Sequence, residues 1–218
     1  MINKLSHSNS HEVILPLSYL PSIDQYCHIA QKSKIVFEVH ETFPKQTCRN
    51  RTVIYTANGI LRLTVPVIKP SGNSSKTHEI LIDNRTQWNR IHWKAIASAY
   101  NKSPFFLYYK DQLERIFCDS GDILTSFNMR LIIFINASLK INPLIELTNE
   151  FRKDYVALAD KRSCTKDINI TDHELNPYTQ VFSDRLPFVP NLSILDLLFN
   201  EGPYAVRYLK NAKLKTPV

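Results

Sequence analysis

The stretch EVILPLSYLPSIDQYCHIAQKSKIVFEV, residues 12–39, predicts a strand, a helix and a second strand in succession. The apolar run Glu12–Leu17 is the first predicted strand. Ser22 and Gln25 have the spacing of a capping box, in which serine caps a helix and glutamine reaches back to it. The run Lys34–Val39 predicts the second strand. A β-α-β unit of this kind normally makes parallel strands with a right-handed crossover, which indicates an α/β fold.

Two loops leave this unit where its strands end. Residues 18–22 follow the first strand, and the second is followed by the polar, cationic part of EVHETFPKQTCRNRTVIYTANG, residues 38–59. Ligands of open α/β sheets bind outside the carboxyl ends of the strands. Loops held by a rigid scaffold also carry most binding and catalytic groups. We therefore expect the two loops to lie together at one edge of the sheet and to form the functional site.

The rest of the chain predicts further strands and then helices. Asn58-Gly59, between the β-rich runs Val53–Tyr55 and Ile60–Val67, is a strong signal for a hairpin with a type I′ turn. Apolar stripes at helical spacing predict three helices in residues 87–139. A second capping box begins at Ser193 and opens a helix that Gly202 ends. The predicted fold is α/β, a mixed β-sheet with a β-α-β opening and a helical C-terminal half.

One domain accounts for this pattern. Hydrophobic residues make up 44% of the chain and charged residues 22%, which is ordinary for a folded protein. We expect a single domain over residues 12–210, sheet-rich in 12–82 and helix-rich in 87–210, with flexible ends at 1–11 and 211–218.

The composition favours anionic partners and excludes two nucleotide-binding motifs. The formal net charge of +7 favours anionic partners, whether phosphate esters, nucleic acid or a membrane surface. The chain has only four glycines, and neither GxGxxG nor GxxxxGK[ST] can be written with them. We expect no cofactor. A bound phosphate would have to be held by side chains or helix N-termini.

The cysteines and the apolar runs bear on the compartment. The four cysteines are widely spaced and form no CxxC, so we expect reduced thiols, with neither a disulfide framework nor a zinc site. No other metal-ligand cluster is recognisable. Residues 1–12 lack the apolar stretch of a signal peptide, and no run of about 18 apolar residues occurs. These observations predict a cytoplasmic protein without a membrane span.

The cationic loop supplies the candidates for substrate binding. The guanidinium groups of Arg49 and Arg51 suit a phosphate or a carboxylate, and Asn50 between them offers a donor and an acceptor for sugar hydroxyls. Lys45 and Gln46 stand in the same loop and complete this part of the predicted set. The alternative is a basic loop edge that makes ordinary surface ion pairs.

Three residues are candidates for proton transfer. Glu38 and His40 alternate at a strand end, so their side chains would share a face and could act as an acid–base pair. A surface pair without a role is the alternative. Asp196 stands where the acid of a capping box stands, which explains it without catalysis, although it could face a pocket as a base. Cys48 beside Arg49 could have a lowered thiol pKa, but a lone cysteine is more often a small buried hydrophobe.

Aromatic residues concentrate in the first two predicted helices. His92 lies beside an apolar stripe and is a further candidate for substrate binding, and the neighbouring Trp93 could stack on a sugar or base. Tyr100, Tyr108 and Tyr109 with nearby cations could bind single-stranded nucleic acid. The helical spacing of these aromatic residues favours a core between helices instead.

Six segments, in their order and spacing, carry a resemblance to a known family: YLP (Tyr19–Pro21), EVHETFPKQTCRNR (Glu38–Arg51), ANG…L.VPV (Ala57–Val67), WNRIHWKAIASAYNKSPFFLYY (Trp88–Tyr109), PYTQVF (Pro177–Phe182) and PNLSILDLLFNEGP (Pro190–Pro203). Together they resemble the WbqC-like family, in the form found in Bacteroidetes-type bacteria, over about residues 13–210. One departure concerns the first loop. Many members begin with a QPxYxPxxGYF-like loop, and residues 16–26 lack its Gln and Gly, so the contribution of this loop to a ligand can differ here.

The resemblance implies an enzyme of surface-polysaccharide or O-antigen biosynthesis. Members often sit in such gene clusters, and aminoacyl transfer to an amino sugar has been suggested for them. Such a transferase would bind a small anionic substrate, a sugar nucleotide or an amino-sugar derivative. Arg49, Arg51 and Lys45 would hold the anion, and Asn50 and Tyr178 would orient the acceptor.

The alternative function is a non-catalytic basic module that binds nucleic acid or an acidic partner. Its affinity for nucleic acid would fall steeply with salt, because phosphate contacts release counterions. The chain has no recognisable nucleic-acid-binding motif, which favours the enzyme.

Overall fold

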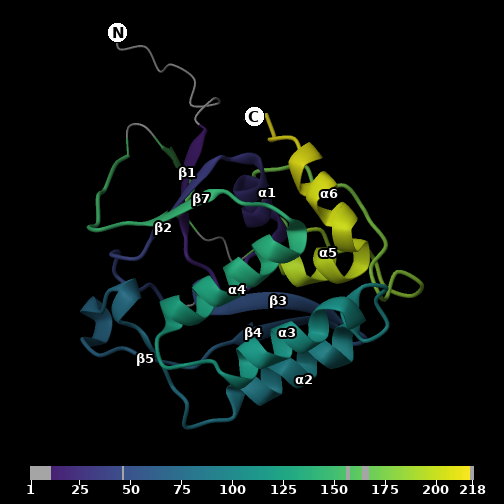
Figure 1. Cartoon of the computed structure of the whole chain (residues 1–218), viewed down its shortest axis with the longest axis horizontal. Coiled ribbons are helices and arrows are strands. Elements are labelled where there is room, and N and C mark those ends of the chain that lie inside the picture. Colours follow the sequence, from purple (N-terminus) through teal and green to yellow (C-terminus); the bar gives the residue numbers. More distant parts are fainter. Residues whose placement is uncertain (1–10, 46, 156–157, 164–166, 217–218) are drawn as a thin grey trace.

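A four-stranded parallel sheet forms one layer of the computed structural model, which describes residues 11–45, 47–155, 158–163 and 167–216 (Figure 1). The strands lie in the order β7-β2-β1-β8, and all three neighbouring pairs are parallel. The bounds are Glu12–Pro16 for β1, Lys34–Glu38 for β2, Leu144–Leu147 for β7 and Ala159–Asp160 for β8. The α/β class and the parallel β-α-β opening that the sequence predicts are confirmed.

Helix α1, Ile23–Gln31, connects β1 to β2. Ser22 caps it as predicted, because its Oγ accepts a hydrogen bond from the Gln25 N–H at 3.3 Å. The other half of the predicted capping box is wrong. The Gln25 side chain donates from Nε2 to the carbonyl of Pro16 at 2.7 Å, so it ties the helix to the end of β1.

The antiparallel strands form two separate pairs. β3 (Arg51–Thr56) and β4 (Gly59–Thr64) make the predicted hairpin, and β5 (Val67–Ile68) pairs with β6 (Leu81–Ile82). Only Gly59 in the hairpin turn has a positive φ, at +96°. A type I′ turn needs positive φ at both central residues, so the turn type predicted from Asn58-Gly59 is wrong. The parallel strand pairs lie in the four-stranded sheet, and the two antiparallel pairs each form a separate two-stranded sheet.

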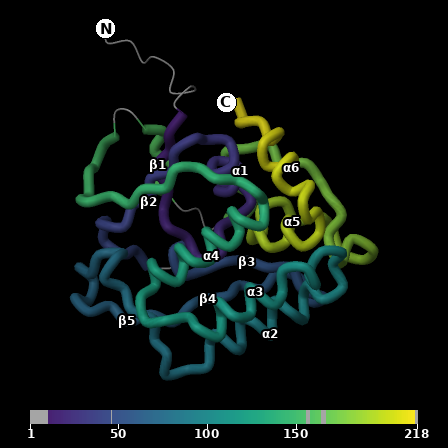
Figure 2. The backbone as a smooth tube through the Cα atoms, viewed as in Figure 1, coloured from purple at the N-terminus to yellow at the C-terminus, as the bar shows by residue number. Residues whose placement is uncertain are grey.

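The predicted helices are present, with one addition. In the view of Figures 1 and 2, α4 runs between the parallel sheet and the β3–β4 hairpin; it packs against α3, which in turn packs against α2. α5 begins after its cap Ser193 and ends at Gly202, as predicted, and α6 follows it. The bounds are Trp88–Tyr100 for α2, Phe106–Cys118 for α3, Leu124–Leu139 for α4, Ile194–Glu201 for α5 and Ala205–Asn211 for α6.

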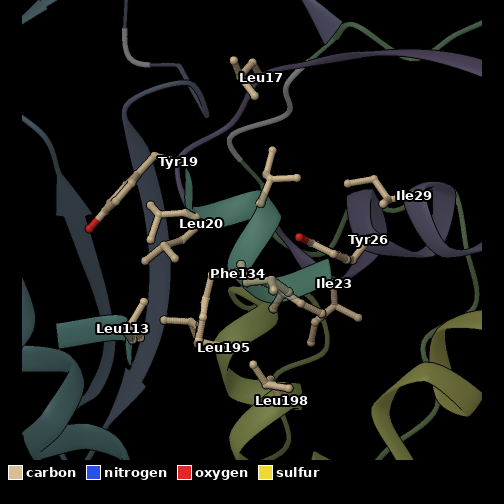
Figure 3. Packing of buried hydrophobic residues seen from close by; sticks show 14 of the residues in the cluster. Leu17, Tyr19, Leu20, Ile23, Tyr26, Ile29, Leu113, Phe134, Leu195 and Leu198 are labelled. Atoms are coloured by element: carbon tan, nitrogen blue, oxygen red, sulfur yellow. The ribbon is translucent and has the colours of Figure 1, made fainter. Parts of the chain in front are cut away.

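The loop after β1 belongs to the hydrophobic core, although it has no regular secondary structure. Leu17, Tyr19 and Leu20 are at most 1% exposed and pack in the same cluster as side chains of α1, α4 and α5. Figure 3 shows these three beside Ile23 and Tyr26 of α1, Phe134 of α4, and Leu195 and Leu198 of α5. Burial of this apolar surface stabilises the loop in its position.

The junction of α5 and α6 depends on the absence of a side chain at Gly202. Its φ is +53°, a region that favours glycine, and a Cβ there would overlap the aromatic ring of Phe105. We expect Gly202→Ala to lower the free energy of unfolding by about 2–4 kcal/mol, measured by urea denaturation. Gly72→Ala is the matched control, because Gly72 has φ +57° but open space around it, and it should cost only about 1 kcal/mol. Equal losses in the two variants would contradict the steric argument.

Candidate functional site

A cavity of about 450 Å³ opens at the carboxyl ends of β1 and β8. Its wall combines the end of β1 and the loop after it, the first turns of α1, the loop before β3, and the segment that follows β8. The polar residues of the wall are Ser18, Ser22, Asp24, Gln25, His28, Thr47, Arg51, Thr52, Arg62, Lys161, Ser163, Asp167, Asp172, Asn191 and Ser193.

The two loops that the topology predicts at one edge do meet there. The Tyr19 N–H donates to the carbonyl of Cys48 at 3.1 Å. Asn128 of α4, which is fully buried, donates from Nδ2 to the carbonyls of Leu17 at 3.1 Å and Arg49 at 2.8 Å. One side-chain amide thus joins both loops to the same helix, and the predicted co-location is confirmed.

Leu20 holds a strained backbone conformation in the cavity wall. Its φ is +43°, although it carries a branched side chain that is fully buried. Its carbonyl accepts hydrogen bonds from Thr52 Oγ1 at 2.7 Å and Ser193 Oγ at 3.4 Å. Such conformations cost about 1–3 kcal/mol and persist only where the surroundings enforce them, often at functional sites.

Two guanidinium groups of the wall make no ion pair with any described residue. Arg51 begins β3 and is half-buried, and its Nε is buried with no hydrogen-bond partner in the described part of the chain. Arg62 of β4 is exposed at the cavity wall. Their charge is available to a ligand in the cavity, because guanidinium groups pair readily with phosphates and carboxylates.

Two imidazole–carboxylate pairs lie at the α1 side of the cavity. His28 Nε2 lies 2.8 Å from Asp172 Oδ2, and Lys161 Nζ lies 3.0 Å from the same oxygen. His173 Nδ1 lies 2.9 Å from Asp24 Oδ1. Hydrogen bonding from His28 holds the pKa of Asp172 well below its usual range, and burial lowers the pKa of His28. Burial alone would raise the pKa of Asp24, but hydrogen bonds from His173 and from backbone N–H groups outweigh it and lower that pKa.

Of the described residues that were predicted to bind substrate in the cationic loop, Arg51 lies at the cavity wall, whereas Lys45, Arg49 and Asn50 do not. Arg49 is 2% exposed and points inward, where its Nε donates to Glu41 Oε1 at 2.7 Å and its Nη1 donates to Thr47 Oγ1 at 2.7 Å. Burial raises the pKa of Glu41, and the ion pair with Arg49 opposes that shift. Asn50 is also buried and donates from Nδ2 to the carbonyl of Val65 at 2.9 Å. Lys45 is exposed outside the wall, and Gln46 lies outside the described residues.

The predicted shared strand face of Glu38 and His40 is wrong, because β2 ends at Glu38 and His40 lies beyond it. The Glu38 carboxylate is fully buried and accepts hydrogen bonds from the backbone N–H of His40 at 2.7 Å and from Thr148 Oγ1 at 3.0 Å. The His40 ring instead lies against His78, with 4.4 Å between ring centroids. Neither predicted proton-transfer residue lines the cavity.

Asp196 and Tyr178 meet each other in a buried polar group away from the cavity wall. Asp196 is 1% exposed, and its Oδ1 accepts hydrogen bonds from Tyr178 Oη at 2.6 Å and Gln180 Nε2 at 3.1 Å. It does not complete the capping box that the sequence predicts, because the Ser193 N–H donates to the carbonyl of Val53 at 2.8 Å. The Asp196 carboxylate instead fastens the PYTQVF segment to α5.

His92 lies behind the cavity rather than in it. It is 5% exposed, and its Nδ1 lies 2.9 Å from the hydroxyl of Tyr19, a residue of the wall. Burial lowers the pKa of His92 to about 4, so the imidazole is neutral at physiological pH. Its contact with the wall therefore passes through Tyr19.

Sequence reasoning missed most of the polar wall: Asp24, His28, Arg62, Lys161 and Asp172. Asp24 and His28 carry a local signal, because residues four apart on α1 share one face. Lys161 and Asp172 carry none. They reach the cavity because the two-residue strand β8 pairs with β1, and such a short strand has no periodicity to detect.

The cysteines differ from their expected state at one position. Cys48, which lines the cavity, is disulfide-bonded, whereas Cys27 and Cys118 are free. The expectation of reduced thiols throughout is therefore wrong at Cys48, because spacing along the sequence does not report distance in the fold. Each helix in the described part of the chain is too short or too polar to cross a membrane.

The amide of Asn128 gives a test of how the cavity wall is held. Asn128→Ala would leave two buried carbonyls without their donor, so we expect a loss of about 2–4 kcal/mol in the free energy of unfolding. Asn136→Ala is the control on the same helix, because Asn136 is also buried and its Oδ1, like that of Asn128, has no hydrogen-bond partner among the described residues, whereas the two loop carbonyls accept from Asn128 Nδ2. Urea denaturation of both variants measures the difference. A loss no larger in Asn128→Ala than in the control would reject this role.

Asp196 makes stability depend on pH. Burial raises the pKa of its carboxyl from the ordinary 3.8 to about 6, although hydrogen bonds from Tyr178, Tyr100 and Gln180 oppose the shift. The stabilisation that the protonated Asp196 carboxyl contributes to the folded state is therefore fully present below about pH 4 and is lost as pH rises through 6. Relative to Asp196→Asn, the native protein should lose on the order of 2–3 kcal/mol between pH 4 and pH 7. Urea denaturation of both proteins across this pH range measures this loss. A difference in the free energy of unfolding that stays constant with pH would contradict the prediction.

Comparison with known proteins places this chain in a family. The model of the WbqC-like protein family matches residues 18–162 and 153–208. The uncharacterized protein Rv1507c of Mycobacterium tuberculosis is 26% identical over 223 residues, an alignment that covers 90% of this chain and 96% of that protein. No solved structure matches the chain significantly. The matched residues include both loops that wall the cavity, and the chain belongs to the WbqC-like protein family.

Proposed function

We propose that this protein is a transferase that binds an anionic sugar derivative in the cavity and transfers a group to it during surface-polysaccharide biosynthesis. The observation that carries the proposal is the pair of guanidinium groups, Arg51 and Arg62, on the wall of a 450 Å³ cavity, where neither makes an ion pair with a described residue. A cavity of this volume suits a small molecule, and small-ligand sites commonly lie at such strand ends.

The wall offers the contacts that a phosphorylated sugar needs. Arginine presents a planar fork of donors that matches the oxygens of a phosphate or a carboxylate. The hydroxyl of Ser163 and the amide of Gln25 stand on the same wall, neither of them buried, and suit sugar hydroxyls, which both donate and accept hydrogen bonds. The substrate class that fits this combination is a sugar nucleotide or an amino-sugar derivative.

The reaction we propose is acyl transfer to an amine, in keeping with the role suggested for WbqC-like proteins. The amine nitrogen of the sugar attacks the acyl carbon of an aminoacyl donor. A C–N bond forms, the bond from that carbon to the leaving group breaks, and the leaving group takes up the proton that the nitrogen gives up. Arg51 and Arg62 would hold the anionic part of the substrate during these steps.

The first test is a thermal-shift screen of the purified protein with sugar nucleotides, amino-sugar phosphates and short oligonucleotides. A ligand that binds only the folded state raises the melting temperature. We expect a shift with a sugar derivative, and Arg51→Ala should weaken its affinity by about 1.5–3 kcal/mol, or roughly 10- to 100-fold. Lys45→Ala is the control, because Lys45 belongs to the same loop but lies outside the wall.

Two outcomes would reject the proposal. If Arg51→Ala and Lys45→Ala affect sugar binding equally, the cavity is not the binding site. A shift with oligonucleotides alone, lost at higher salt, would indicate a basic surface that binds nucleic acid. The melting temperature of each variant without ligand separates a binding defect from a folding defect.

A further inference from the structure

Two imidazoles and a carboxylate converge at the α1 side of the cavity. Asp24 and His28 are four residues apart on α1, and His173 comes from the segment after β8. Asp24, His28 and His173 each offer one atom that could bind a metal, and these atoms all lie within 4.8 Å of one another. Among the described residues this is the one group of three or more histidine, cysteine or carboxylate side chains so arranged.

Each imidazole of this cluster is oriented by a carboxylate through one ring nitrogen. His28 Nε2 lies 2.8 Å from Asp172 Oδ2, and His173 Nδ1 lies 2.9 Å from Asp24 Oδ1. Histidines that bind metals usually direct their second ring nitrogen to a carboxylate or carbonyl in this way, which fixes the ring and strengthens the metal bond. Asp172 has this role for His28. Asp24 belongs to the cluster itself, so His173 would meet a shared ion through Nδ1, the nitrogen that faces the Asp24 carboxylate.

His173 presents Nδ1 to the cluster and directs Nε2 away from it. The residue is fully buried, and this nitrogen makes no hydrogen bond to any described residue. Because the two nitrogens of an imidazole ring point in divergent directions, Nε2 lies away from the Asp24 carboxylate and takes no part in the cluster. The rings of His28 and His173 are in contact, with centroids 4.5 Å apart, so a single small ion could reach both.

Rigid backbone contacts hold the carboxylate of the cluster in place. Asp24 accepts hydrogen bonds from the N–H of His173 at 2.9 Å and from the N–H of Asp172 at 3.2 Å. These bonds fasten the segment after β8 to α1 and position the two imidazoles relative to the carboxylate. Pre-organised ligands of this kind bind a metal without reordering the chain.

We propose that Asp24, His28 and His173 bind a divalent transition-metal ion, with Zn²⁺ as the best match. Two imidazoles and one carboxylate form a common ligand set for zinc sites that keep a fourth position open. Asp24 and His28 also line the cavity, so the open position would face it. A metal there would act as a Lewis acid beside the bound substrate. This proposal can be tested independently of the sugar-binding role, because the experiment measures metal binding and needs no sugar substrate.

The test is a titration of the tag-free, EDTA-treated full chain with Zn²⁺ by isothermal calorimetry, with metal analysis after dialysis. We expect one Zn²⁺ per chain. His173→Gln should weaken the affinity by at least about tenfold, since even residues that only orient metal ligands contribute 10- to 100-fold. His78→Gln is the matched control, because His78 belongs to the other close imidazole pair, with His40, and should leave the affinity unchanged.

A second variant and a spectroscopic signature keep the test decisive if His173→Gln folds poorly. His28→Gln should likewise weaken the affinity by at least about tenfold, and circular dichroism establishes that each variant is folded. With Co²⁺ in place of Zn²⁺, the native protein should develop visible d–d absorption that both variants lack. The proposal is overturned if no stoichiometric Zn²⁺ binds, or if His173→Gln and His28→Gln bind Zn²⁺ as tightly as the native protein. It is equally overturned if binding is lost in His78→Gln instead.

Discussion

The cavity depends on the hydrogen bonds that join the loop after β1 to the loop before β3. The backbone of Tyr19 bonds to the carbonyl of Cys48, and the amide of Asn128 donates to a carbonyl in each loop. These contacts hold the strained Leu20 in the wall and fix the point at which β3 begins. Because Arg51 is the first residue of β3, the same contacts determine where its guanidinium lies.

Burial divides the cationic loop into structural and exposed parts. Arg49 forms an ion pair with Glu41 inside the protein, whereas Arg51, two residues later, lies at the cavity wall. An unpaired guanidinium is very costly to bury, so a buried arginine needs a carboxylate partner. Glu41 supplies that partner from the same loop, eight residues earlier. The RNR sequence therefore combines a residue that holds the loop with one that can meet a ligand.

The candidate site was only partly predictable from the sequence. The expectation that two loops meet at a sheet edge followed from topology, and Arg51 was among the predicted binding residues. Arg49, Asn50 and Asp196 were selected for their chemistry, yet each is buried and bonded within the protein. Residue type shows what a side chain can bind. It does not show whether the protein has already supplied the partner.

The sequence by itself determined the β-α-β opening, the hairpin, the main helices and the family, because these follow from local periodicity, caps, turns and segment order. Only the tertiary structure decided which polar residues face the cavity. Lys161, Asp172 and His173 are far along the chain from His28, and they reach it because β8 pairs with β1 and the segment after it bonds to Asp24. Such contacts depend on long-range packing, and a two-residue strand leaves no periodic signal from which to infer them.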